Sequence, residues 1–383
     1  MKNKIKTLIT MSFLAGAMFS CTEVEPLALD GQAAKDLYEN RDKDKWAAEE
    51  AQKEQNIQDS IRIAEKNERK YQLYLADLVE YKKTKHLVMF GWFNAWSATT
   101  PGEYSQLNLI PDSMDIASIW GNRWDLDEAR IAQMREVQAK GTKVIVGYIV
   151  ENVGNGLNHP KDTWSDDPQE GVIGYAKSIL DSIAKYGYDG FDIDYEPSYS
   201  SPFKQGNHCG DWPYVYDEDY NEIVDWDNWY KNKPIVSCSS YDNKELENLF
   251  FQTLRDGLNE LAVKNNKEYI LNLNGSIHYL DPDMAGLFDY FVPQSYNGGY
   301  SSWTSTITSR LGQETKDKII YTQTFENNET NRKGFLTYAK FVKDNLGGEA
   351  GGIGAYHINE DTFYDNKYMN VRTCITYMNP PIK

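Results

Sequence analysis

From residue 86 onward, short apolar runs alternate with amphipathic segments. Eight runs rich in β-branched and aromatic residues have the length of strands: 86–95, 114–122, 143–152, 190–196, 269–278, 288–296, 318–327 and 352–359. Helical periodicity separates several of them, for instance over 127–140, 171–186, 244–264 and 334–346. Strands that alternate with helices are typical of parallel sheets, and eight such units over about 275 residues predict a (β/α)8 TIM barrel. A doubly wound open sheet would instead place a glycine-rich loop after its first strand, where Trp92-Phe93-Asn94 stands.

The first residues have the pattern of a targeting signal. Three lysines over 2–6 precede an apolar stretch over 8–19, which is too short to span a bilayer, and Cys21 follows. This predicts a signal peptide over 1–20 and resembles a bacterial lipobox, which implies a lipidated Cys21, although Met18 and Phe19 depart from its commonest form. We therefore expect a lipid-anchored protein of the outer membrane or cell surface. The alternative is an ordinary secretory peptide.

A linker over 21–31 leads into a charged segment over 32–85 that contains neither proline nor glycine. Its apolar residues recur at spacings of three and four or their sums, which predicts a long helix with a narrow apolar seam. The seam consists of Ile57, Ile61, Ala64, Tyr71, Leu75 and Leu78. We expect a stalk or a helix docked on the barrel, which would occupy 86–383. A coiled coil is disfavoured because three clean heptads are absent.

Charge and composition limit the partners. A net charge of −17 argues against nucleic acid and anionic membranes as ligands, so lipid would be the only link to the membrane. The 27 Tyr, 10 Trp and 14 Phe suit a protein that stacks against sugar rings. Cys209 and Cys238 could close one loop and leave Cys374 buried. Because no Cys or His spacing is typical of a metal site, we expect neither metal nor cofactor.

The octapeptide DGFDIDYE over 189–196 places several carboxylates on one face of a strand. Side chains alternate along a strand, so Asp192, Asp194 and Glu196 point one way and the apolar residues between them point the other. Burying three acids is costly, which favours a chemical role over a structural one. An acidic edge strand or a calcium loop is the alternative, but a calcium loop needs a glycine-containing turn of oxygen ligands, whereas this segment has to be extended and packed.

The spacing D-x-x-D-x-D-x-E in this strand resembles the catalytic strand of glycoside hydrolase family 18, the chitinases and endo-β-N-acetylglucosaminidases. The sequence QSYN over 294–297 is similar to the Q-x-Y-N form of the endoglycosidases rather than the M-x-Y-D form of chitinases. Tyr356 stands where many chitinases have a tryptophan. The short interval between Glu329 and the predicted helix leaves no room for the insertion found in many chitinases.

The resemblance implies a retaining mechanism without an enzyme nucleophile. Glu196 would protonate the leaving oxygen, and Asp194 would hold the substrate's acetamide while its oxygen attacks the anomeric carbon. Asp192 would share a proton with Asp194, and Tyr296 would orient the acetamide from the other side.

Strand ends of a TIM barrel carry its site, so we predict substrate contacts from eight further residues. These are Trp92, Asn94, Trp120, Asn274, Gln294, Asn297, Gln323 and Tyr356. An aromatic-rich loop over 197–241 would help to select the glycan. We expect a monomeric endo-β-N-acetylglucosaminidase that cuts between the two N-acetylglucosamines of N-linked glycans on glycoproteins. A chitinase and a non-catalytic glycan-binding lipoprotein are the alternatives, although the presence of both Glu196 and Asp194 favours an enzyme.

Overall fold

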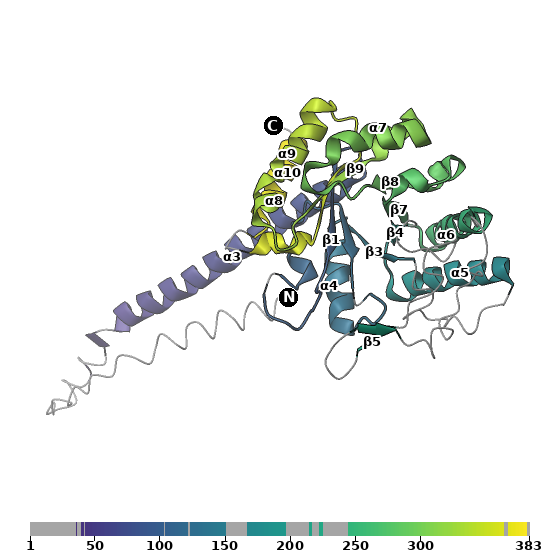
Figure 1. Cartoon of the computed structure of the whole chain (residues 1–383). Helices are drawn as coiled ribbons and strands as arrows, with labels where there is room; N and C mark the ends of the chain where they lie inside the picture. Colours follow the sequence, from purple (N-terminus) through teal and green to yellow (C-terminus); the bar gives the residue numbers. More distant parts are fainter. Residues whose placement is uncertain are drawn as a thin grey trace. The chain divides into compact units, whose positions relative to one another are not determined.

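The computed structural model describes residues 36, 40, 41, 43–102, 104–121, 123–150, 167–196, 214–216, 222–224, 244–363 and 367–380 (Figure 1). The chain forms two compact units, Met1–Gln72 and Leu73–Lys383. The predicted signal peptide, the linker, Cys21, Cys209 and Cys238 lie outside the described residues, as does most of the loop over 197–241. Cys374 is a buried free thiol.

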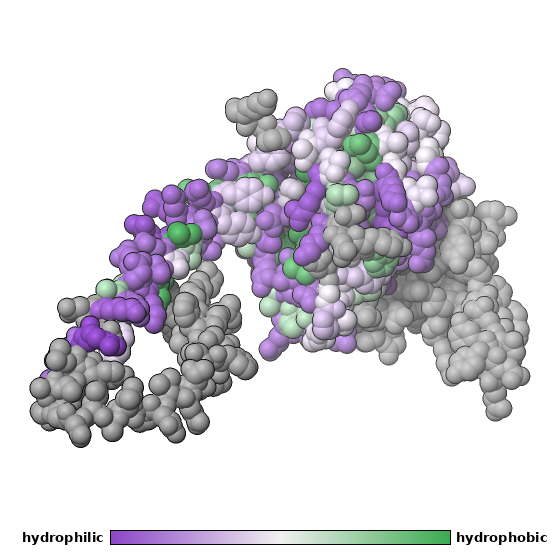
Figure 2. Space-filling model, turned by 90° about the vertical axis from the view of Figure 1, so that its left-hand side faces the viewer, coloured by the Kyte–Doolittle hydropathy of each residue, from purple (hydrophilic) through white to green (hydrophobic). Residues whose placement is uncertain are grey.

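The charged segment is a helix, α3, which runs from Lys43 to Lys82. Every predicted seam residue except Tyr71 is partly buried, whereas most other side chains of the helix are exposed. Its surface in Figure 2 is accordingly hydrophilic, with isolated hydrophobic side chains. An N-terminal helical extension is thus confirmed. Among the described helices, none is both long and apolar enough to cross a membrane.

The unit from residue 73 contains the predicted barrel. Its parallel strands are β1 (Val88–Phe93), β2 (Ile116–Ile119), β3 (Lys143–Ile149), β4 (Gly190–Tyr195), β7 (Ile270–Gly275), β8 (Tyr290–Val292), β9 (Ile320–Thr324) and β10 (Gly352–Tyr356). They pair in the order β8-β7-β4-β3-β2-β1-β10-β9, and a bridge between Phe291 and Ile319 joins the two outer strands. The sheet therefore closes on itself, which confirms the TIM barrel and rejects the open doubly wound sheet. A separate antiparallel pair consists of β5 (Tyr214–Tyr216) and β6 (Glu222–Val224).

Helices connect many of these strands on the outside of the barrel. They are α4 (Glu128–Gln138), α5 (Pro168–Tyr186), α6 (Lys244–Asn265), α7 (Tyr300–Leu311), α8 (Glu329–Gly334), α9 (Leu336–Lys340) and, after β10, α10 (Met369–Met378). Local sequence sets their ends: the Asp167 carboxylate caps α5 by accepting from the backbone N–H of Gln169 and Glu170, and Gly187 ends α5 with φ 73°. Between β1 and β2 the described residues form only a 3-10 turn, Leu107–Leu109.

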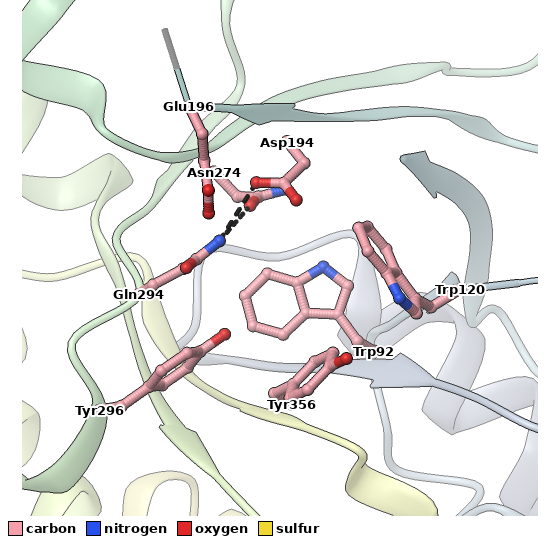
Figure 3. Close-up of a pocket in the computed structure, with 8 residues that line it drawn as sticks. All are labelled: Trp92, Trp120, Asp194, Glu196, Asn274, Gln294, Tyr296 and Tyr356. Atoms are coloured by element: carbon pink, nitrogen blue, oxygen red, sulfur yellow. Dashed lines mark hydrogen bonds between the residues drawn. The ribbon is translucent and has the colours of Figure 1, made fainter. Parts of the chain in front are cut away.

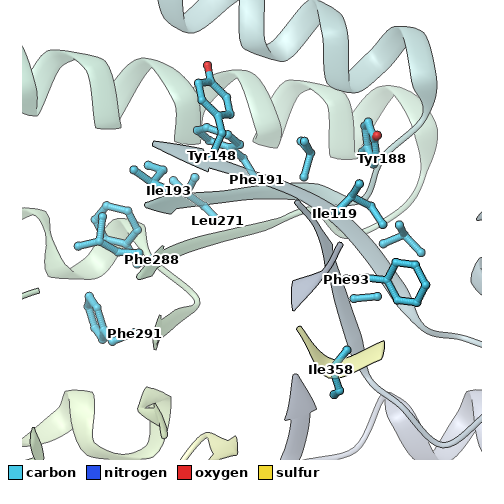
Figure 4. Close-up of a cluster of buried hydrophobic side chains, with 14 of the residues drawn as sticks. Phe93, Ile119, Tyr148, Tyr188, Phe191, Ile193, Leu271, Phe288, Phe291 and Ile358 are labelled. Atoms are coloured by element: carbon cyan, nitrogen blue, oxygen red, sulfur yellow. The ribbon is translucent and has the colours of Figure 1, made fainter. Parts of the chain in front are cut away.

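Two hydrophobic layers hold the barrel together. The inner layer fills the barrel with side chains such as Val88, Phe90, Ile145 and Ile320, while the outer layer lies between strands and helices. Figure 4 shows part of the outer layer, where Phe191 and Ile193 of β4 pack among Tyr148, Leu271 and other apolar side chains. Burial of this apolar surface is the main stabilising contribution to such a fold.

Candidate active site

Strand β4 has the alternation that its sequence predicts. Asp192 and Asp194 lie on the inner face of the barrel, whereas Phe191, Ile193 and Tyr195 belong to the outer core. Gly190 makes the start of the strand possible, because a Cβ at its φ of 155° would lie 2.0 Å from the carbonyl oxygen of Ile270. Glu196 follows the last strand residue and is partly exposed. The row of carboxylates therefore leads from the buried core to the carboxyl-terminal end of the barrel.

A cavity of about 220 Å³ opens at this end (Figure 3). Its lining comprises Trp92, Trp120, Asp194, Glu196, Asn274, Gln294, Tyr296 and Tyr356. In Figure 3 the carboxylates and amides lie on one side and the aromatic rings on the other. Such a combination suits a sugar, because aromatic rings cover its apolar faces and polar groups bind its hydroxyl and amide groups.

Asp192 lies beneath the cavity and is fully buried. Its Oδ2 accepts hydrogen bonds from Trp92 Nε1 at 2.7 Å and from Ser118 Oγ at 2.9 Å. Burial raises the pKa of Asp192 to about 6, against the opposing effect of hydrogen-bond donors. Gly147 leaves the space that this carboxylate occupies, since a Cβ there would lie 3.1 Å from Asp192 Oδ2.

Asp194 lines the cavity and is in contact with an amide. Gln294 Nε2 donates to Asp194 Oδ1 at 3.1 Å and also to Asn274 Oδ1 at 3.3 Å (Figure 3). Two acids on one strand face thus have different surroundings, one buried under the cavity and one presented to it.

Aromatic rings form the other side of the cavity. The rings of Tyr296 and Tyr356 are stacked with centroids 6.3 Å apart, and Tyr356 meets Trp92 and Trp120 edge to face. Burial, followed by the charges of Asp194 and neighbouring groups, raises the pKa of Tyr296 well above its usual value. Its phenol therefore stays protonated at neutral pH and is able to donate a hydrogen bond.

The cavity brings together Glu196, Asp194 and Tyr296 with five of the eight predicted substrate contacts. Asn94, Asn297 and Gln323 do not line it. Gln323 Oε1 accepts from the backbone N–H of Asn297 at 2.8 Å and of Thr324 at 2.9 Å, so it supports the turn after β8. Asn297 Oδ1 accepts from Asn331 Nδ2. Sugar binding by these three residues stays a prediction.

Sequence reasoning missed Ser118, the partner of Asp192. The sequence did contain a signal for it, because Ser118 is a polar residue within an apolar run and alternation places it on the same face of β2 as Ile116. The described residues contain no cluster of His, Cys, Asp and Glu able to hold a metal ion.

Comparison with known proteins agrees with this geometry. The model of a family described as "Glycoside hydrolase family 18, BT1044-like" matches residues 51–211, which include β4 and Glu196. BT1044, in a selenomethionine form with a Glu-to-Gln substitution, is 26% identical over 80% of this chain and 92% of its own, with a TM-score of 0.58. The chain is thus similar to glycoside hydrolase family 18 in sequence over these residues and in its fold.

Two further solved structures share the fold. The endo-β-N-acetylglucosaminidase from Cordyceps militaris in apo form is 20% identical over 80% of this chain and 95% of its own, with a TM-score of 0.53. A double mutant of that enzyme in complex with fucosyl-N-acetylglucosamine-Asn is 19% identical over the same shares, also with a TM-score of 0.53. No curated protein matches the chain in sequence. The similarity to this family makes the cavity the candidate active site of a glycosidase.

Proposed function

We propose that the protein is an endo-β-N-acetylglucosaminidase that hydrolyses the GlcNAc-β1,4-GlcNAc bond of N-linked glycans with retention of configuration. The observation that carries this proposal is the meeting of Glu196, Asp194, Gln294 and Tyr296 in one cavity. Among the described residues that line it, Asp194 and Glu196 are the two carboxylates, and both come from the same end of β4. This arrangement suits catalysis in which the substrate supplies the nucleophile.

In the first step, Glu196 donates a proton to the glycosidic oxygen as the bond to the anomeric carbon breaks. The carbonyl oxygen of the substrate's own acetamido group attacks that carbon from the other face and forms an oxazolinium ion. Asp194 accepts a hydrogen bond from the acetamide N–H and stabilises the positive charge of the oxazolinium ion. Asp192 shares a proton with Asp194. Tyr296 donates to the acetamide oxygen.

In the second step, Glu196 takes a proton from water, whose oxygen attacks the anomeric carbon and opens the oxazolinium ring. The released sugar then has the β configuration of the substrate, and Glu196 regains its proton.

Two features support an N-glycan rather than chitin as the substrate. Gln294 and Tyr296 contribute to the cavity as the Q-x-Y-N motif implies, and β9 ends only a few residues before α8, which leaves no room for an inserted domain. The Cordyceps militaris complex contains fucosyl-N-acetylglucosamine-Asn, the protein-linked end of such a glycan. In that mutant an Asp and a Glu two positions apart carry the substitutions, the same spacing as Asp194 and Glu196.

The proposal is tested by incubating the protein with an N-glycosylated protein and, separately, with chitin oligosaccharides, followed by mass spectrometry. We expect one N-acetylglucosamine to remain on the glycoprotein. Glu196→Gln should lower kcat by at least about a thousandfold with little loss of glycan binding, because the amide cannot act as an acid. Efficient cleavage of chitin oligomers with an intact glycoprotein would identify a chitinase. Glycan binding without any cleavage would identify a binding protein.

We also propose that the protein is anchored by lipid on Cys21 at the outer membrane or cell surface. Cys21→Ala should move it from the membrane fraction to the soluble fraction, because several acyl chains together anchor stably. Membrane association of the variant at the wild-type level would show that another part of the chain provides the attachment.

A further inference from the structure

A series of hydrogen-bonded polar side chains lies behind the residues that line the cavity, and His357 is at its centre. His357 follows Tyr356 at the end of β10 and is only 8% exposed. Its backbone has φ 53° and ψ 46°, in the left-handed region that residues other than glycine seldom adopt. Strained residues of this kind persist where their surroundings fix them, and they concentrate at functional sites.

One side of the imidazole faces carboxylates. His357 Nδ1 lies 3.4 Å from Glu360 Oε1 and 3.8 Å from Glu326 Oε1. The second oxygen of Glu360 accepts from Arg332 Nη1 at 2.9 Å and from the backbone N–H of Asn327 at 2.8 Å. Because Glu360 pairs with Arg332, its carboxylate oxygens accept hydrogen bonds. The facing atom, His357 Nδ1, therefore has to carry a proton and donate it to this hydrogen bond.

The other side of the imidazole holds an amide. His357 Nε2 lies 3.0 Å from Asn94 Nδ2, directly beyond the end of β1. Asn94 Oδ1 is buried and has no hydrogen-bond partner among the described residues, so His357 provides the one side-chain hydrogen bond of this amide there. Asn359 fixes the backbone of Asn94 through both its N–H and its carbonyl oxygen.

The same ring supports the aromatic wall of the cavity. The centroids of His357 and Tyr356 are 4.1 Å apart, and Tyr356 in turn contacts Trp92, Trp120 and Tyr296. The hydrogen-bonded series Arg332, Glu360 and His357 therefore contacts two parts of the site. These are the ring of Tyr356 and the segment that follows Trp92.

We propose that His357 is a positioning residue of this cavity, which holds Tyr356 and the segment after Trp92 in place through a ring protonated at Nδ1. The proposal rests on the glycosidase function proposed above. His357 does not line the cavity, so it exchanges no proton with the substrate. A wall that contacts the sugar equally in the ground state and in the transition state affects KM rather than kcat.

Two substitutions separate the contributions of this ring. His357→Asn is compatible with the left-handed backbone and keeps a donor toward Glu360, but it removes the ring and the contact with Asn94. His357→Phe keeps a ring against Tyr356 and removes both hydrogen bonds. We expect each variant to raise KM for a glycopeptide about tenfold, with kcat within about a factor of two of wild type.

His86→Asn is the matched control. His86 is also a buried histidine paired with a carboxylate, that of Asp115, but it precedes β1, at the end of the barrel away from the cavity. It should lower Tm and leave KM unchanged. If the His357 variants likewise lower Tm with unchanged KM, their role is purely structural and the inference is wrong.

A second measurement does not depend on turnover. The ¹⁵N spectrum of the wild-type histidine rings, with His357 assigned by its loss in His357→Asn, should show a proton on Nδ1. A ring protonated on Nε2 alone would overturn the inference even if the enzyme cleaves glycans. If the wild type cleaves no glycan, the proposed function fails. The affinity for N,N′-diacetylchitobiose, measured by calorimetry, then takes the place of KM. Equal affinity of wild type and His357→Phe would refute the positioning role.

Discussion

Neighbouring carboxylates of one strand face differ in their surroundings. Asp192 is fully buried and accepts from an indole and a hydroxyl group, whereas Asp194 faces the cavity and accepts from the amide of Gln294. Burial raises the pKa of Asp192, whereas Asp194 accepts its hydrogen bond from Gln294 at the cavity.

This difference predicts how stability depends on pH. The folded pKa of Asp192, about 6, is above its unfolded value, so folding takes up a proton between about pH 4 and pH 6 and stability falls as pH rises through this range. Asp192→Asn keeps an oxygen for Trp92 and Ser118 and cannot ionise. We expect the variant to be more stable than wild type at pH 7.5, by up to about 3 kcal/mol, and to lose this advantage at pH 4.5.

Urea unfolding of both proteins at the two pH values measures this effect. The wild type and the variant should converge toward acid pH. Parallel pH dependence of the two unfolding free energies would show that Asp192 does not titrate differently in the folded and unfolded states.

At the level of single residues, alternation along the strands predicted the inner and outer faces, while five of the eight residues predicted at strand ends line the cavity. Alternation placed Asp192, Asp194 and the apolar residues of β4 correctly, because one face of a barrel strand points inward. Gln323 shares the parity of Tyr321, which is in the outer core, so its amide supports a turn. The conformation of that turn depends on Asn297 with φ 56°, which no periodic pattern reveals.

At the level of elements, apolar runs predicted each barrel strand, while the connections were less regular than expected. Pro101, Gly102 and Pro111 lie between β1 and β2 and are incompatible with a long helix, which agrees with the 3-10 turn found there. The predicted helix over 334–346 is divided into the end of α8, α9 and a π-helical turn, Phe341–Asn345. Such breaks depend on tertiary packing and have no signature in hydrophobic periodicity.

An ion pair joins the starts of two strands. His86 Nε2 lies 3.0 Å from Asp115 Oδ1, and His86 Nδ1 lies 2.7 Å from the carbonyl oxygen of Thr84. Asp115 Oδ2 accepts from the backbone N–H of Met89. Burial disfavours the charged ring, but the hydrogen bond and charge of Asp115 outweigh it, so the pKa of His86 is raised. The imidazolium therefore links the segment before β1 to the start of β2.

Because the folded pKa of His86 is raised, the stabilisation is complete below the unfolded pKa of about 6.5 and is lost as pH rises through the folded pKa. His86→Gln should lower the free energy of unfolding by about 1–3 kcal/mol at pH 6 and by clearly less at pH 9. Chemical denaturation at the two pH values gives the comparison. A loss of equal size at both would mean that packing, and not charge, is responsible.

At the level of the whole molecule, the cavity and the end of α3 lie at opposite ends of the barrel strands. The cavity opens where the strands end, whereas the last residues of α3 contact the chain where strands begin. Lys82 Nζ donates to the carbonyl oxygens of Asp112 and Met114 and to Thr142 Oγ1, which precede β2 and β3. Since a TIM barrel carries its chemistry at the carboxyl ends of the strands, a helix fixed at the opposite end leaves that site accessible.

The boundary of the second unit at Leu73 leads to a prediction about truncation. Removing residues 1–72 keeps the last turns of α3 with Lys82, so Tm and glycan cleavage should match those of a chain that lacks only residues 1–20. Removing residues 1–84 also removes Lys82 and thus the hydrogen bonds that its ammonium group donates to part-buried oxygens, which should lower the free energy of unfolding by about 1–3 kcal/mol. Lys82→Met in the longer chain is the matched control, because it deletes the ammonium group and keeps the helix. If both truncations unfold at the same temperature, the end of α3 does not stabilise the barrel. If the shorter truncation already destabilises it, residues before Leu73 contribute to its stability as well.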